Sequence, residues 1–238
     1  MNLHRSYAGA ILATALIAAL AGCGRFSGFE NLTGVEACDP TSTTFSVSID
    51  NPFFPLPVGH RVVLEGEEGG QHLLVRVTAL DETETVDGVE TRVVEEYEAK
   101  SGQVVEISRN FFAQAEDGTV CYFGEDVDIY GSDGTTVVSH SGAWRAGDGD
   151  NQPGVFMPPT LEVGEAFQQE IAPGVAEDQA KVVALGEKTE VPAGTFDDTA
   201  TLEDGSPLDG SVGTKVYARG IGLIVDGPAR LTSYSTPT

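Results

Sequence analysis

Basic residues are scarce in this chain of 238 residues, which has 13 Lys and Arg against 37 Asp and Glu and a formal net charge of −24. A surface this negative repels phosphate backbones, so we expect no nucleic-acid partner. The acidic residues are spread along the chain rather than gathered in blocks, and 40% of residues are hydrophobic. This composition predicts a folded chain rather than a disordered one.

Long apolar runs are also missing. The longest uncharged one covers residues 8–22 (AGAILATALIAALAG) and follows Arg5. It is too short to cross a bilayer comfortably, which argues against a permanent transmembrane helix. A basic start, a short apolar run and small residues at its end are typical of a secretory signal.

The end of this run, Leu20-Ala21-Gly22-Cys23, resembles the bacterial lipobox. The resemblance implies cleavage between Gly22 and Cys23, a diacylglycerol group on the Cys23 thiol, and a further acyl chain such as palmitate on the new amino terminus. Several acyl chains anchor a protein stably to a bilayer surface. Because glycine rather than aspartate follows Cys23, we expect the outer membrane where the cell has one, and otherwise the outer face of the cell membrane. An ordinary cleaved signal with a chance cysteine is the alternative.

Cysteine is rare, and lipidation of Cys23 leaves only Cys38 and Cys121. In an oxidising compartment these two can form a disulfide, which would close a loop of 83 residues. The alternative is that Cys121 is simply a buried thiol.

Sustained helical periodicity is absent after the signal, whereas short alternating stretches separated by turns recur throughout. Residues 61–65 and 71–80, for example, flank the glycine-rich stretch 66–70 and predict a hairpin. The pattern predicts an all-β fold with little helix, either an antiparallel sandwich or a curved sheet or half-barrel. We expect a signal peptide at 1–22, a lipidated tether at 23–42 and a single β domain at 43–235.

An internal similarity recurs at an offset of 105 residues. Val77, Ala79 and Leu80, for example, return as Val182, Ala184 and Leu185. Such a fixed spacing is typical of a duplicated unit. We therefore expect two related halves, at about 51–123 and 156–226, separated by an acidic insert at 124–155.

Several blocks resemble a family of secreted bacterial β-rich proteins, many of them lipoproteins, that have no assigned activity. The blocks are NPFFPLPVGHRVVLEG, CYFGEDV, GAWRAGDGDNQPGVFMPP, EVPAGTFDD and KVYARGIGLI. The resemblance supports a single domain at residues 50–225 and implies no catalytic residue.

The insert holds the candidate metal ligands. Carboxylate oxygens are the donors that Ca²⁺ prefers, and the candidates are Glu125, Asp126, Asp128, Asp148 and Asp150. The loop departs from the calcium-binding Asp-x-Asp-x-Asp-Gly pattern because Pro153 stands where the turn glycine belongs. A solvated acidic loop is therefore the alternative to a Ca²⁺ site.

Aromatic residues supply the other candidates. Phe53 and Phe54 lie in a proline-rich stretch, and Trp144 is the only tryptophan. They could form a ligand-binding or partner-binding lip, or else an aromatic plug at one end of the core. The sequence favours a non-catalytic, membrane-tethered binding or structural scaffold. A Ca²⁺-dependent protein or hydrolase with its site in residues 124–155 is the alternative function.

Overall fold

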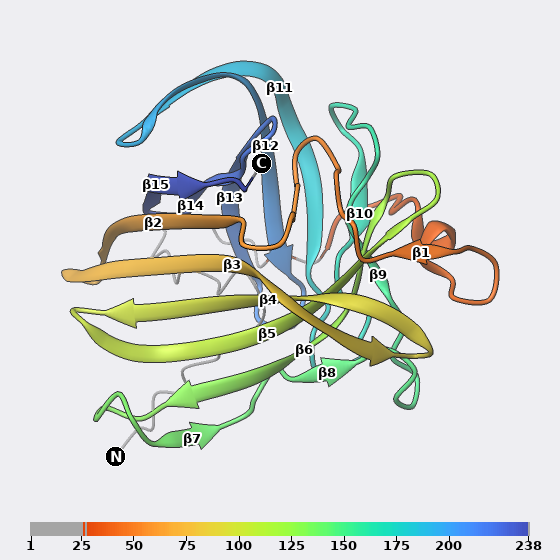
Figure 1. Ribbon diagram of the computed structural model, residues 1–238, viewed down its shortest axis with the longest axis horizontal. Helices are drawn as coiled ribbons and strands as arrows, with labels where there is room; N and C mark the ends of the chain where they lie inside the picture. The colour runs from red at the N-terminus through yellow and green to blue at the C-terminus, as the bar shows by residue number, and fades with distance from the viewer. Residues whose placement is uncertain (1–25, 27, 238) are drawn as a thin grey trace.

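The computed structural model describes residues 26 and 28–237 (Figure 1). Signal cleavage at Gly22 and lipidation at Cys23 fall outside this range. The regular elements of the described chain are one short 3₁₀ helix, η1 (Val35–Cys38), and fifteen strands. The strands of the first half are β1 (Phe45–Ser46), β2 (Arg61–Glu68), β3 (Gln71–Val86), β4 (Val89–Lys100), β5 (Gln103–Ala115) and β6 (Val120–Tyr130). The remaining strands are β7 (Val137–Ser139), β8 (Trp144–Arg145), β9 (Gly154–Met157), β10 (Ala166–Gln168), β11 (Gln179–Val191), β12 (Gly194–Ser206), β13 (Ser211–Ala218), β14 (Gly222–Asp226) and β15 (Ala229–Ser235).

These strands form one antiparallel sheet in the order β10-β11-β12-β13-β14-β15-β2-β3-β4-β5-β6-β7. Strand β1 pairs with β5, and β8 and β9 pair with β6. The all-β prediction is therefore confirmed, in its curved-sheet form. Because β15 pairs with β2, the two halves of the chain share a single sheet.

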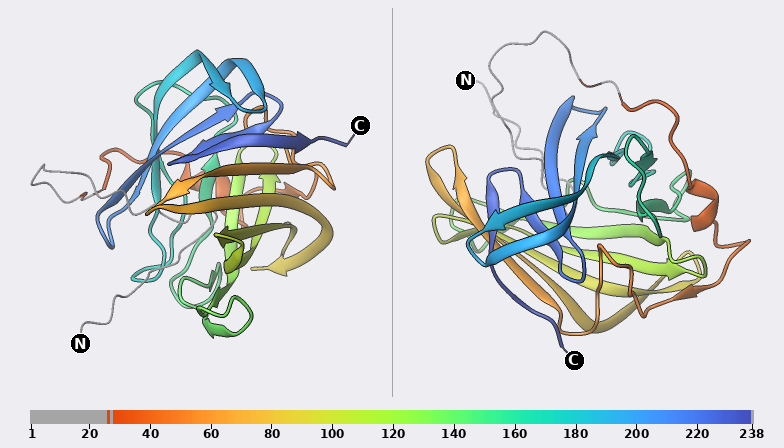
Figure 2. Two further views of the ribbon diagram at one scale, coloured as in Figure 1. Left: turned by 90° about the vertical axis from the view of Figure 1, so that its left-hand side faces the viewer. Right: turned by 90° about the horizontal axis from the view of Figure 1, so that it is seen from above.

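The sheet curls until its two ends meet. Strand β9, which pairs with β6, lies against the segment that follows β10: Gln152 forms a bridge with Ile171, and the Gln169 side chain donates to the Phe156 carbonyl. Strands β2–β6 and β10–β13 consequently lie on opposite sides of the curled sheet, and we call its concave face the interior (Figures 1 and 2).

The offset of 105 residues also relates strand boundaries. Strand β3 ends at Val86 and β11 at Val191, whereas β4 begins at Val89 and β12 at Gly194. The two long hairpins thus occupy equivalent places in the two halves. A duplication of the unit remains a prediction. The predicted insert 124–155 is not separate from the sheet, since it supplies β7, β8 and part of β9.

The predicted loop at 66–70 is wrong in length. Strand β2 continues to Glu68 and β3 starts at Gln71, so only Gly69 and Gly70 form the turn. Both have positive φ, at 57° and 78°, as a two-residue hairpin turn requires. The strand was predicted to end at residue 65 because the acidic residues before these glycines are typical of a loop.

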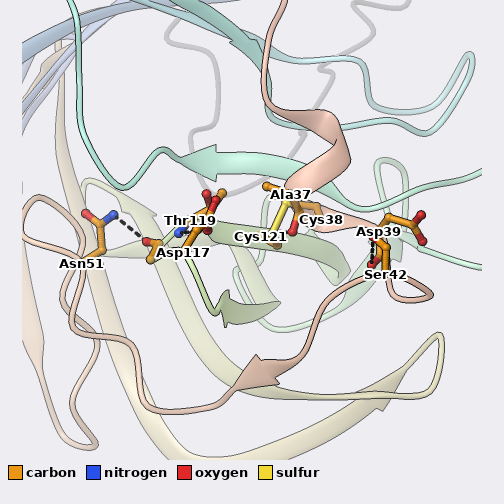
Figure 3. The surroundings of a disulfide bond; sticks show 9 residues. Ala37, Cys38, Asp39, Ser42, Asn51, Asp117, Thr119 and Cys121 are labelled. Atoms are coloured by element: carbon orange, nitrogen blue, oxygen red, sulfur yellow. Dashed lines mark hydrogen bonds between the residues drawn. A yellow bond between two sulfur atoms is a disulfide. The ribbon is translucent and has the colours of Figure 1, made fainter.

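The disulfide between Cys38 and Cys121 is confirmed (Figure 3). It joins η1 to β6, with the two Cα atoms 5.6 Å apart. The predicted tether at 23–42 differs from the structure, because from Gly28 onward this segment lies along the domain. Phe29 donates its backbone N–H to the Gln179 side chain, and Leu32 forms a parallel bridge with Ala166. We call residues 28–38 the strap.

Candidate functional site

The interior of the curled sheet has an apolar end and an acidic end. Phe112, with no exposed surface, stacks on Tyr122 at 4.7 Å between ring centroids and packs edge-on against Phe54 and Phe156. The proline-rich stretch at 51–58 closes this end by inserting Phe54. A cavity of about 20 Å³ between Phe54, Leu56 and Tyr217 has room for roughly one water molecule. The apolar end is therefore a filled core.

The acidic end lies further along the same strands. Glu98 of β4 pairs with Glu106 of β5, and Glu96 with Ser108. Side chains alternate between the two faces of a strand, so these residues share the inward face with Val94 and Phe112. Carboxylates from four other parts of the chain join them. We call the whole set the interior acidic cluster: Glu96, Glu98, Glu106, Glu125, Glu170, Asp178, Asp204 and Asp226.

Two lysines form ion pairs with acids of this cluster. The ammonium of Lys215, a residue only 3% exposed, forms an ion pair with Asp204. Lys100 is more accessible and lies 2.5 Å from Glu68 and 3.4 Å from Glu98. The acids thus outnumber the bases, and burial of so many carboxylates is unfavourable unless they bind protons or positive charge.

The pKa values follow from this burial. Desolvation, added to by Glu98, raises the pKa of Glu106 to about 8. Desolvation also raises the pKa of Asp226 to about 6, although Lys215 opposes it. The pKa of Glu125 is raised well above its usual value, first by burial and then by repulsion from Glu170. Near neutral pH part of the cluster therefore holds protons.

Some buried polar atoms of this end have no hydrogen-bond partner among the described residues. They include both carboxylate oxygens of Glu125, one oxygen each of Glu96 and Asp204, and the hydroxyl of Tyr217. Tyr217 lies between the two ends. The centroid of its ring is 6.4 Å from that of Phe54. Burial, and then the charges of Asp204, Asp226 and Glu96, raises the pKa of its hydroxyl. Most buried polar groups in proteins are paired with other protein groups or with ordered water, so these atoms are the ones that an ordered water or a bound molecule would partner.

A bulge in β6 positions Glu125. Asn110 pairs with Glu125 but Phe112 pairs with Tyr122, so an extra residue is accommodated between them. Gly124 has a φ of 123°, and a Cβ there would lie 2.2 Å from the Trp144 carbonyl oxygen. Glycine thus lets β8 approach, and both Tyr122 and Glu125 point inward.

The predicted Ca²⁺ ligands are not brought together, so that set is wrong as a single site. Glu125 points inward, whereas Asp126 is exposed and its Oδ2 lies 2.7 Å from an Arg145 nitrogen. Asp128 pairs with His140 at 3.0 Å, and Asp148 and Asp150 lie in an exposed turn. Alternation along β6 separates Glu125 from Asp126 and Asp128. No group of three or more His, Cys, Asp or Glu residues in the described part of the chain is arranged to hold a metal ion.

The predicted aromatic lip is wrong as well, because all three residues are buried. Phe54 lies in the apolar core, and Trp144 packs edge-on against Tyr122 at 5.4 Å. Phe53 is covered by the guanidinium of Arg219, 4.6 Å from its ring centroid. The alternative interpretation, an aromatic plug, describes Phe54 and its surroundings.

The sequence suggested none of the interior acidic cluster outside residues 124–155. A signal was nevertheless present in β4, where Glu96 and Glu98 alternate in phase with Val94. In the sequence alone, a strand face with two glutamates is expected to be exposed to solvent.

Over the described residues, no helix is both long and apolar enough to pass through a bilayer. No protein-family model matches the chain, and comparison with curated proteins and with solved structures finds no match either.

Proposed function

We propose that this chain is a non-catalytic binding protein of the bacterial cell envelope that holds a small ligand inside its curled sheet. The single observation that carries the proposal is the set of buried, unpartnered polar atoms at the acidic end, above all Glu125 and Tyr217. A curled sheet with a purely structural role would gain stability from apolar residues at these positions, since unpaired buried polar groups are unfavourable. Their presence is consistent with a ligand that supplies the missing partners.

The location rests on the lipobox-like sequence at Cys23. The disulfide between Cys38 and Cys121 supports it, because structural disulfides persist in oxidising compartments. Phe26 lies beside Gly205 at the end of β12, and the chain between Cys23 and Phe26 can reach at most about 11 Å. An acylated Cys23 would therefore hold the Gly205 end of the sheet close to the membrane surface.

The alternative of a metal-dependent protein or hydrolase at residues 124–155 has less support, because Asp126, Asp128, Asp148 and Asp150 lie outside the interior. A melting experiment with Ca²⁺ and with EDTA tests it directly. We expect no change in the melting temperature on chelation.

The binding function is tested by native mass spectrometry of protein released gently from its own membrane. We expect a retained small-molecule mass that is lost on denaturation. A protein that carries no such mass, and that retains no member of a broad metabolite library, would leave only a structural role. Location has a separate test: Cys23→Ser, or inhibition of the lipoprotein signal peptidase, should release the protein from the membrane fraction or block its processing.

A further inference from the structure

The interior acidic cluster has a regular spacing along β4 and β5. Glu98 and Glu106 face each other on one rung, Glu96 and Ser108 form the next inward rung, and Asn110 leads across to Glu125 on the following one. Inward rungs are two residues apart, or roughly 7 Å, so Glu106 and Glu125 are separated by roughly 13 Å along β5. The acids therefore form a row rather than a point.

The opposite wall adds to this row. This wall contains Asp204 of β12, Lys215 of β13 and Asp226 of β14. The pKa of Glu96, raised mainly by burial, is raised further by Asp226 and lowered by Lys215. The segment between β10 and β11 contains Glu170 and Asp178, whose charges raise the pKa of Glu125 further. A ligand between the walls would meet negative charge on both sides.

The chemistry of such a ligand is restricted by three observations. A cationic ligand suits the cluster, because the acids exceed the two lysines and a bound cation would replace the protons that part of the cluster holds. It must donate hydrogen bonds, because the unpartnered carboxylate oxygens of Glu125, Glu96 and Asp204 accept them. It must be longer than one ion, because the described carboxylates do not converge as metal ligands do.

The Tyr217 hydroxyl is evidence independent of the acids. The residue is 1% exposed, and its hydroxyl has no hydrogen-bond partner among the described residues. Burial, and then repulsion from Asp204, Asp226 and Glu96, raises the pKa of this hydroxyl. A phenol oxygen can accept a hydrogen bond from an ammonium group while its proton goes to a carboxylate. The ring below it belongs to the apolar end, which suits the methylene chain of a ligand.

We propose that the interior acidic cluster binds a linear organic oligoamine of the spermidine type, with successive ammonium groups on successive rungs of β4 and β5. This rests on the proposed binding function and names the class of its ligand. Chains of three or four methylene groups place neighbouring nitrogens about 5 to 6 Å apart, close to the spacing of the rungs. Each ammonium group can donate up to three hydrogen bonds to carboxylates.

The experiment is isothermal titration calorimetry of the full-length protein with spermidine, with the diamine putrescine, and with Mg²⁺. We expect one spermidine per chain, weaker binding of putrescine because it occupies fewer rungs, and no displacement of spermidine by Mg²⁺ beyond ordinary salt screening. Affinity should rise as the pH increases from about 6 to about 8, the range in which Asp226 and Glu106 ionise. Binding near pH 7 should release protons, measurable as a dependence of the heat on the buffer.

Two neighbouring residues give a matched pair of variants. Glu125→Gln removes an inward carboxyl that would ionise against an ammonium group, and should weaken spermidine binding about tenfold or more. The same change should raise the melting temperature of the ligand-free protein, because it removes an unfavourable buried carboxyl. Asp126→Asn removes an outward charge one residue away and should change neither affinity nor proton release.

The inference is overturned if Glu125→Gln binds spermidine as tightly as the parent, or if Mg²⁺ competes as a specific ligand. Retention of an uncharged or anionic compound in native mass spectrometry, without amine binding, would overturn the oligoamine and leave the binding function intact. Retention of no compound of any class would remove the binding function itself.

Discussion

Strand β5 contains both ends of the interior, and they differ sharply. At one end Phe112 has no exposed surface and packs among Phe54, Tyr122 and Phe156. At the other end Glu106, also on the inward face and only 4% exposed, lies among carboxylates that repel it. Burial stabilises the fold at the first position and destabilises it at the second. The apolar end therefore provides the stability that lets the acidic end remain unfavourable without a ligand.

The largest expected effect comes from the disulfide, which fixes the strap at the apolar end through Cys121. Cys121 pairs with Ala113, next to the inward pair of Tyr122 and Phe112. Replacing Cys38 and Cys121 by serine releases a closure of 83 residues and should lower the free energy of unfolding by about 4.5 kcal/mol. Urea denaturation of the parent and the double variant measures this.

The matched control is the parent protein under reducing conditions, which should unfold like the double variant. Because neither cysteine belongs to the interior acidic cluster, the dependence of stability on pH should be the same with and without the disulfide. Equal stability of parent and double variant would show that the strap contributes nothing to the apolar end.

The apolar end itself is tested at Phe112. Phe112→Ala should lower the free energy of unfolding by about 4 kcal/mol, since it removes a fully buried ring and leaves a cavity. Phe112→Leu keeps most of the volume and should lose about 1 to 2 kcal/mol. Comparable losses for the two variants, in the same denaturation experiment, would contradict the close packing of Phe54, Phe112 and Phe156.

The acidic end is tested by pH. Carboxyl groups with a raised pKa in the folded protein bind protons more tightly folded than unfolded, so they favour folding at low pH and this contribution is lost as the pH rises. For Glu106 the interval runs from its ordinary value of 4.5 to about 8. The ligand-free protein should therefore lose on the order of 3 kcal/mol of stability across this interval.

The same measurement on Glu106→Gln supplies the control. Its loss of stability with rising pH should be smaller than that of the parent, whereas Phe112→Leu should keep the full slope. A parent protein that becomes more stable between pH 4.5 and 8 would mean that the cluster is already paired with positive charge.

This comparison also explains how far the sequence predicted the molecule. The β class and the Cys38–Cys121 pairing were predictable, because alternation and the scarcity of cysteine leave few other solutions. The interior acidic cluster was not. Glu96 and Glu98 occupy one face of β4, and alternation assigns a charged face to solvent unless another part of the chain covers it. That cover comes from Asp204, Lys215 and Asp226 of β12, β13 and β14, more than 100 residues later, and no local pattern contains it.

The insert was misread for a similar reason. Five acidic residues close in sequence suggested one Ca²⁺ site. Consecutive side chains of a strand, however, point to opposite faces of the sheet. Along β6, Glu125 enters the interior while Asp126 reaches out to Arg145. The five residues were grouped because they are close in sequence, but the alternation of side chains along β6 places Glu125 and Asp126 on opposite faces.

Glu125 and Asp126 give the smallest effects and the sharpest contrast, because consecutive residues should respond with opposite signs. Glu125→Gln replaces a fully buried carboxyl that has no partner among the described residues, and should raise the free energy of unfolding at pH 7 by about 1 to 3 kcal/mol. The gain should shrink towards pH 4.5, where the unfolded chain also begins to hold the proton. Asp126→Asn breaks an exposed ion pair with Arg145 and should lower the free energy of unfolding by about 0.5 kcal/mol. Arg145 keeps its position over the Phe111 ring, 4.5 Å from the centroid, so the outer face should remain ordered. Losses of equal size for both variants, measured by urea denaturation at pH 7, would place Glu125 in a stabilising contact and remove the distinction between the two faces of β6.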